Sequence, residues 1–279
     1  MNDQIKLVAA DMDGTLLNSD RKVSEYTQQI IRKVLHQGVH FVAATGRAFN
    51  AMPKELETIE KIRYGIFSNG ATVYDIREKK VLYKNQFQPK QALELIDFVR
   101  QFDNMVSMIH NGQSYGERSQ MENIDYYELD TYTREMLISS RKIIENTEEY
   151  IKEHDDTVEK VTLVFRTFEE KEKVREALKE LDFIQYASSL PKNLEISKKG
   201  CNKGDGLLHL TQVLGIGPKE TMACGDADND MEMLQQAGLA IVMENGLDSM
   251  KKLADYITVT NNEDGVAKAM EKFVLKRFL

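Results

Sequence analysis

The chain has 279 residues, of which 42% are hydrophobic and 29% charged, enough to bury a sizeable core in one large or two modest domains. Its formal net charge of −8 argues against a nucleic-acid partner, because phosphate backbones recruit cationic surfaces. Its apolar runs are too short for a membrane span, and Met1–Leu7 lacks the apolar region of a secretory signal. The two cysteines, Cys201 and Cys224, exclude a disulfide framework and predict a reducing, cytoplasmic location.

The N-terminal stretch predicts a strand, a helix and a second strand. The apolar run Ile5–Ala10 is typical of a buried strand, and it stops abruptly at the polar Asp11–Thr15. A helix with Ser24 as its N-cap and Gly38 at its end follows, and Val39–Ala44 is the next apolar strand. Because no tight turn joins them, the two strands are expected to be parallel.

A short third strand and a hairpin follow. Gly65–Phe67 is apolar and ends at the polar Ser68–Ala71. Thr72–Tyr74 and Val81–Tyr83 flank a polar segment, which predicts an antiparallel pair.

The pattern changes after about Phe87. Pro89 begins an amphipathic helix, and an Asn-Gly turn at residues 111–112 between Met105–Ile109 and Gln113–Gly116 is a strong hairpin signal. Further predicted elements are the helix Glu148–His154, the strand Val158–Phe165, the helix Glu169–Leu181 and the strand Phe183–Ala187. This mixture of hairpins and surface helices predicts an inserted α+β domain over residues 86–190.

The first pattern is expected to return from about Leu194. The predicted elements are the helix Lys203–Leu214, the strand Thr221–Cys224, the helix Met231–Ala237, the strand Leu239–Met243, the helix Gly246–Leu253, the strand Tyr256–Thr260 and a helix from about Glu263 to Phe278. The fold class is therefore α/β. Residues 1–85 and 191–279 should form a doubly wound, Rossmann-like parallel-sheet core, which the second domain interrupts.

Polar clusters follow several of these strands or begin a helix. In open parallel sheets, ligands bind at the carboxyl ends of the strands, where helix N-termini offer unpaired N–H groups to anions. We expect one pocket to gather Asp11, Asp13, Thr45, Lys203, Asp226 and Asn229.

The clustered carboxylates call for a cation. The residues concerned are Asp11, Asp13, Asp226, Asp228 and Asp230, and so many acidic groups repel one another when left unpaired. Mg²⁺ suits a few carboxylates together with phosphate oxygens. Carboxylates, a metal, Lys203 and Thr45 around an anion form a set of groups typical of phosphoryl transfer.

The ordered motifs resemble those of the haloacid dehalogenase superfamily of phosphohydrolases. Asp11-Met12-Asp13-Gly14-Thr15 is similar to its DxDGT signature, Thr45 to its second motif and Lys203 to its third. Gly225–Asp230 is similar to its GDxxND motif. Thr45-Gly46-Arg47 and Ser68–Ala71 resemble the Cof-type branch, whose αβ cap is inserted where the middle block lies.

The resemblance implies a site and a mechanism. Asp11 would be the nucleophile that forms an aspartyl-phosphate, and Asp13 the general acid and base. Mg²⁺ would be held by the Asp11 carboxylate, the Asp13 backbone carbonyl and Asp226. Phosphate oxygens would be bound by Thr45, Gly46, Lys203, Asn229 and the Met12 backbone N–H, and Asp230 would fix a metal-bound water or Lys203. The expected substrate is a small phosphorylated metabolite, such as a sugar phosphate or a phosphorylated cofactor, which the cap selects.

Several alternatives stay open at this point. Arg47 either contacts substrate or pairs with a carboxylate, and Asn69 either lies near substrate or is a turn residue. A phosphomannomutase-like transferase would keep the chemistry and need an Arg-rich cap, and a non-catalytic phosphate-binding regulator would not need Asp13. We expect neither a nucleic-acid nor a membrane partner, and a monomer or weak homo-oligomer.

Overall fold

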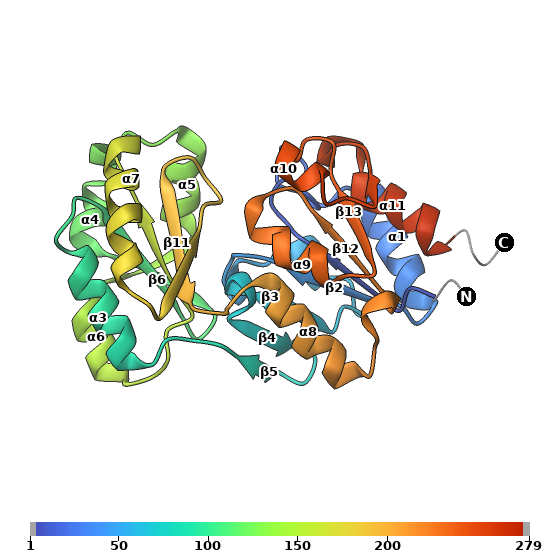
Figure 1. The fold of residues 1–279 in the computed structure, drawn as a ribbon, viewed down its shortest axis with the longest axis horizontal. Helices are drawn as coiled ribbons and strands as arrows, with labels where there is room; N and C mark the ends of the chain where they lie inside the picture. Colours follow the sequence, from blue (N-terminus) through green and yellow to red (C-terminus); the bar gives the residue numbers. More distant parts are fainter. Residues whose placement is uncertain (1–3, 276–279) are drawn as a thin grey trace. The chain divides into compact units, whose positions relative to one another are not determined.

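The computed structural model describes residues 4–275, which divide into two compact units (Figure 1). The first unit contains the described parts of Met1–Arg47, Met52–Lys84 and Asn202–Leu279. The second contains Ala48–Ala51 and Asn85–Cys201. The chain thus contributes residues 48–51 to the second unit, returns to the first, builds most of the second unit from residues 85–201 and then returns again.

The first unit is built on an eight-stranded sheet. In lateral order its strands are β14 (Tyr256–Ile257), β13 (Leu239–Val242), β12 (Thr221–Gly225), β1 (Leu7–Ala10), β2 (His40–Ala44), β3 (Tyr64–Phe67), β4 (Thr72–Asp75) and β5 (Lys80–Lys84). All neighbours from β14 to β3 are parallel, and β4 and β5 add an antiparallel hairpin at one edge. The predicted parallel sheet and the predicted hairpin are both confirmed.

Helices of the first unit pack in pairs, α1 with α11 and α8 with α9. The helices are α1 (Glu25–His36), α2 (Lys54–Glu57), α8 (Lys203–Leu214), α9 (Met231–Gln236), α10 (Asp248–Lys251) and α11 (Gly265–Phe273). Ser24 caps α1 by accepting a hydrogen bond from the Thr27 N–H at 3.0 Å, as predicted. The last residues of the predicted C-terminal helix, up to Phe278, lie partly outside the described range.

The sheet of the first unit is covered on both faces. Along β1, Leu7 and Ala9 belong to a core cluster that includes Leu210 of α8. Val8 and Ala10 alternate with them and point to the opposite face, and all four β1 side chains are fully buried. A strand buried on both faces appears in the sequence as a continuous apolar run.

The second unit contains a six-stranded sheet. Its lateral order is β10 (Ile184–Ala187), β11 (Asn193–Lys198), β9 (Lys160–Val164), β6 (Met105–His110), β7 (Gln113–Glu117) and β8 (Arg141–Ile144). Neighbours are antiparallel except β7 and β8. The helices are α3 (Pro89–Val99), α4 (Arg118–Glu122), α5 (Thr131–Ser140), α6 (Thr147–His154) and α7 (Phe168–Ala177). One core cluster packs α3, α6 and α7 against the sheet.

Two features of the second unit differ from expectation. The strand β11 pairs with β9 and β10 of this sheet, so the first pattern does not return at Leu194, and the second unit runs on to Cys201, past the expected boundary at residue 190. Within β11, Leu194 and Ile196 enter the core cluster, and the alternating residues are polar. The edge strand β8 was not predicted. Among the described residues, no helix has the length and apolar character needed to cross a membrane.

Candidate active site

Polar residues follow adjacent strands of the first sheet. Asp11 comes directly after β1, Thr45 after β2 and Asp226 after β12, while Lys203 is the first residue of α8. Because β12, β1 and β2 are parallel neighbours, their carboxyl ends lie side by side. The topology therefore gathers segments that are up to about two hundred residues apart in the chain, as the Lys203 contact with Asp11 shows.

Lys203 is the centre of this group. Its side chain is fully buried, and its Nζ donates to Asp11 Oδ1 at 2.6 Å and to Asp230 Oδ1 at 2.7 Å. Burial by itself lowers the pKa of Lys203, but the two carboxylates outweigh it and raise that pKa above its usual value. Lys203 therefore stays charged and joins Asp11 of the motif similar to DxDGT to Asp230 of the motif similar to GDxxND.

Asp230 is occupied on both of its oxygens. Beside the bond from Lys203, its Oδ2 accepts the backbone N–H of Asp226 at 2.9 Å and that of Ala227 at 3.1 Å. These bonds hold the loop after β12 in place, and Gly225 allows the approach, since a Cβ there would lie 2.6 Å from Asp230 Cβ. Asp230 thus orients Lys203 and the Asp226 backbone.

Thr15 and Gly14 shape the surroundings of Asp226. The Thr15 hydroxyl donates to Asp226 Oδ1 at 2.6 Å. Gly14 has a φ of +81°, and a Cβ at that position would stand 2.4 Å from Asp226 Oδ2, so a side chain there is excluded. The sequence pattern assigned neither residue a role of its own; the available signal was the hydroxyl of Thr15 within the motif similar to DxDGT, two residues after Asp13.

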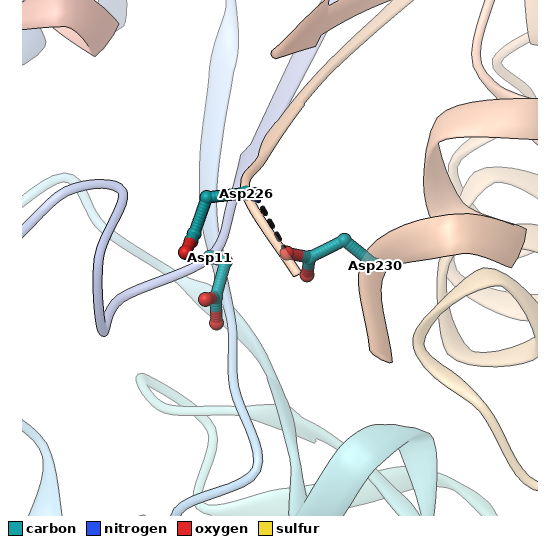
Figure 2. A group of neighbouring side chains, drawn as sticks. All are labelled: Asp11, Asp226 and Asp230. Atoms are coloured by element: carbon teal, nitrogen blue, oxygen red, sulfur yellow. Dashed lines mark hydrogen bonds between the residues drawn. The ribbon is translucent and has the colours of Figure 1, made fainter. Parts of the chain in front are cut away.

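Three carboxylates come together at this point. One oxygen from each of Asp11, Asp226 and Asp230 lies within 4.8 Å of the others, and Figure 2 shows these side chains reaching the same region from separate segments. Burial raises the pKa of Asp226 to about 6, and burial likewise raises that of Asp11 well above its usual value although Lys203 opposes it. Lys203 alone cannot balance two buried carboxylates and a half-buried one, so the donor set fits a divalent cation with oxygen ligands.

Asp13 stands apart from the three carboxylates. Its side chain is 46% exposed and is paired with Arg47, whose Nε donates to Asp13 Oδ2 at 2.8 Å and whose Nη2 donates to Oδ1. The Arg47 backbone N–H donates to the Thr45 hydroxyl at 3.1 Å. Of the two interpretations of Arg47, the geometry shows the carboxylate pairing.

The remaining predicted residues line the same edge of the sheet. Met12 and Thr45 are buried, and Gly46 lies between Thr45 and Arg47. Asn229 Nδ2 donates to Asn69 Oδ1 at 3.4 Å. In the described part of the chain, the buried Asn229 Oδ1 has no hydrogen-bond partner; because it is an acceptor, the group that completes it must be a donor.

Known proteins share this plan. A family model described as haloacid dehalogenase-like hydrolase matches residues 8–270. The chain is 30% identical to 5-amino-6-(5-phospho-D-ribitylamino)uracil phosphatase YcsE of Bacillus subtilis, over 97% of this chain and 96% of that protein. It is 28% identical to phosphatase YwpJ of the same organism, over 96% and 99%. A solved haloacid dehalogenase-like hydrolase from B. subtilis superposes with a TM-score of 0.83 at 26% identity, covering 96% of this chain and 99% of that one.

Proposed function

The chain belongs to the haloacid dehalogenase-like hydrolase family and is a phosphatase, and from this premise we propose that it is Mg²⁺-dependent. The reaction is hydrolysis of small phosphomonoesters through an aspartyl-phosphate on Asp11, with Asp13 as general acid and base. The observation that carries the proposal is the buried Asp11 carboxylate held by Lys203 beside Asp226.

Asp11 is prepared for attack on phosphorus. Lys203 holds Asp11 Oδ1, which leaves Oδ2 to form the new bond while the bond from phosphorus to the substrate oxygen breaks. Asp13, once it has left Arg47 and taken up a proton, gives that proton to the departing alkoxide. In the second step a water attacks the phosphoryl group, Asp13 takes a proton from that water, and Asp11 is released together with inorganic phosphate.

Binding of the phosphoryl group is assigned to groups around Asp11. Thr45, Gly46, Lys203, Asn229 and the Met12 backbone N–H would hold its oxygens. Donors already aimed at the anion stabilise the charge that develops in the transition state, and one such donor is typically worth about 3–4 kcal/mol.

The metal site is assigned to Asp11, Asp226 and the Asp13 backbone carbonyl. Bound Mg²⁺ supplies Lewis-acid polarisation of a phosphoryl oxygen and neutralises the charge of the substrate. Asp230 is occupied by Lys203 and by two backbone N–H groups. Its proposed role is to orient Lys203 and the Asp226 backbone.

The proposed substrates are sugar phosphates or phosphorylated cofactors. The name of the YcsE relative specifies a phosphate ester on a ribityl chain, so a phosphorylated polyol is the first compound to test. Residues 85–201 are proposed to act as the cap that selects the leaving group and excludes water during the first step.

Hydrolysis is favoured over a mutase reaction by the arginines of the second unit. A mutase cap needs arginines able to grip phosphate. Of the six arginines in residues 85–201, five are paired with carboxylates: Arg100 with Glu117, Arg118 with Glu145, Arg134 with Asp125, Arg166 with Glu128 and Arg175 with Glu172. The sixth, Arg141, donates to the hydroxyls of Ser107 and Ser140. The hydrolase family itself disfavours a non-catalytic regulator.

The test is a phosphate-release screen over phosphorylated sugars, polyols and cofactors, with Mg²⁺ and with EDTA. We expect metal-dependent release from a subset of these compounds, and we expect the Asp11→Asn variant to be inactive. Sugar-phosphate isomerisation without release would instead identify a mutase, and no release from any compound would overturn the proposal.

A further inference from the structure

The turn after β3 has an unusual backbone. Ser68, Asn69 and Gly70 have φ angles of +54°, +56° and +94°. Glycine adopts this region freely, whereas serine and asparagine do so at a cost that the surrounding structure must offset. Ser68 and Asn69 are also buried, with 0% and 5% of their surface exposed. A strained, buried polar turn points to a role beyond connecting β3 to β4.

The backbone of this turn is bonded to the second motif. The Ser68 N–H donates to the Arg47 carbonyl and the Asn69 N–H to the Thr45 carbonyl, both at 3.0 Å. The left-handed conformation aims both N–H groups at the loop after β2. The position of Thr45 therefore depends on the shape of the Ser68–Gly70 turn.

The same turn lies against the start of α8. A Cβ on Gly70 would stand 2.0 Å from the Asn202 carbonyl oxygen, so only glycine permits this approach. Asn202 is the N-cap of α8 and accepts from the Asp205 N–H at 2.8 Å. The residue that follows Asn202 is Lys203, so the turn also packs beside the third motif.

The Asn69 side chain reaches the fourth motif. Its Oδ1 accepts from Asn229 Nδ2 at 3.4 Å, which sets the rotation of the Asn229 carboxamide. One N–H of Asn229 is engaged in this way, which leaves its second N–H to donate to a phosphate oxygen. Without Asn69, that carboxamide could rotate.

We propose that Asn69 is a positioning residue for phosphate binding, which acts through the Asn229 carboxamide and, by its backbone, through Thr45. The inference rests on the proposed function for the identity of the anion. It replaces the interpretation of Asn69 as a direct substrate contact, and it makes the Ser68–Gly70 turn a fifth element of the site.

The test is a double-mutant cycle of Asn69→Gly and Asn229→Ala, because glycine keeps the left-handed backbone and removes only the side chain. The probe is inorganic phosphate, titrated calorimetrically into the Mg²⁺-loaded full chain. We expect Asn69→Gly and Asn229→Ala each to weaken phosphate binding about tenfold, the value of one hydrogen bond to an anion. The double variant should be no weaker than Asn229→Ala alone, within about twofold.

Controls separate positioning from general damage. Lys79→Gly changes a left-handed residue (φ +51°) in the exposed turn between β4 and β5, leaves Asn69 in place and should bind phosphate like the wild type. The Mg²⁺ concentration giving half-maximal phosphatase activity should be unchanged in Asn69→Gly, because the contacts through which Asn69 is proposed to act are with Thr45 and Asn229, neither of which is a proposed metal ligand. The inference would be overturned if the fold-losses of phosphate affinity in the two single variants multiplied in the double variant. It would also be overturned if Asn69→Gly bound phosphate as tightly as the wild type.

The inference can still be tested if Asn69→Gly does not fold or if the wild type hydrolyses no ester. If Asn69→Gly does not fold, Asn69→Asp keeps the acceptor oxygen, and its added charge cancels within the cycle. Asn229→Ala should then weaken binding as much in the Asn69→Asp background as in the wild type, and an unchanged affinity there would count against the inference. Phosphate binding by a wild type that hydrolyses no ester would refute the proposed function while the cycle still tests Asn69.

Discussion

Each unit holds a buried or half-buried cation between two carboxylates, but the two arrangements differ in their surroundings. In the second unit, Arg100 donates to Glu117 at 2.9 Å and to Glu148 at 2.9 and 2.7 Å, and its side chain is 29% exposed. In the first unit, Lys203 binds Asp11 and Asp230 without any exposure.

The pKa shifts of the two groups have opposite signs. Although burial opposes it, Arg100 lowers the pKa of Glu117, and hydrogen bonding to Arg100 lowers that of Glu148. Burial raises the pKa of both Asp11 and Asp226. Glu117 and Glu148, which Arg100 satisfies, have lowered pKa values, whereas Asp11 and Asp226, which are proposed to bind a metal, have raised ones.

The largest expected effect follows from removing the nucleophile. Asp11→Asn should reduce kcat by a factor of about 10⁴ or more, because no covalent intermediate can form. Steady-state phosphate release measures it, and circular dichroism shows that the fold persists. Asp228→Asn, an exposed carboxylate in the neighbouring loop, is the matched control and should stay within about twofold. Comparable losses in both variants would contradict the assignment of Asp11.

The next largest expected effect comes from replacing the two cations, Lys203 and Arg100, which should differ in both stability and activity. Lys203→Met should lower the free energy of unfolding by about 3–5 kcal/mol and abolish activity, because it leaves buried carboxylates uncompensated. Arg100→Met should cost about 1–2 kcal/mol, since solvent screens part of that cluster, and should retain kcat. Urea denaturation and phosphate release of each variant test this. A loss of turnover in folded Arg100→Met would break the distinction between the Arg100 cluster and the Lys203 site.

The metal-free protein should lose stability as pH rises. Burial raises the pKa of Asp226 to about 6 in the folded state, against an ordinary value of 3.8, so between these values the folded state binds more protons than the unfolded state. Stability should therefore fall by about 1 kcal/mol from pH 5 to pH 7.5, and Mg²⁺ should raise Tm more at pH 7.5 than at pH 5. The lowered pKa values of Glu117 and Glu148 matter only below this window.

Thermal unfolding with EDTA or Mg²⁺ at the two pH values measures this slope. Asp226→Asn is the matched variant, and it should flatten the pH dependence while weakening the response to Mg²⁺. A metal-free stability that increases between pH 5 and pH 7.5 would show that these carboxylates are not in surplus.

The smallest expected effect concerns the ion pair between Arg47 and Asp13 in the first unit. Arg47→Ala should change the free energy of unfolding by less than about 1 kcal/mol, because solvent screens its pair with Asp13. It should alter kcat/KM by about tenfold or less, since Asp13 loses an orienting partner and keeps its chemistry. Urea denaturation and kinetics measure both quantities. Inactivity as complete as that of Asp11→Asn would mean that Arg47 has a catalytic contact of its own.

Local patterns were sufficient for most of the first unit. Its parallel strands are buried on both faces and appear as apolar runs, and Ser24 and Gly38 mark the two ends of α1 as expected. Local patterns were insufficient at β11, where Leu194 and Ile196 alternate with polar residues. That alternation predicts a half-covered strand, but it carries no information on which sheet the strand joins, because pairing is decided by distant residues.

By itself, the sequence determined the order of the motifs and the chemical types they carry, since residues such as Asp11 and Lys203 are identified by spacing and strand ends. The tertiary structure decided which of them meet: Lys203 between Asp11 and Asp230, Arg47 on Asp13, and Asn69 on Asn229. The reason is physical. A side chain's chemistry is local, whereas its charge balance and burial depend on neighbours that only the folded sheet brings within hydrogen-bonding distance.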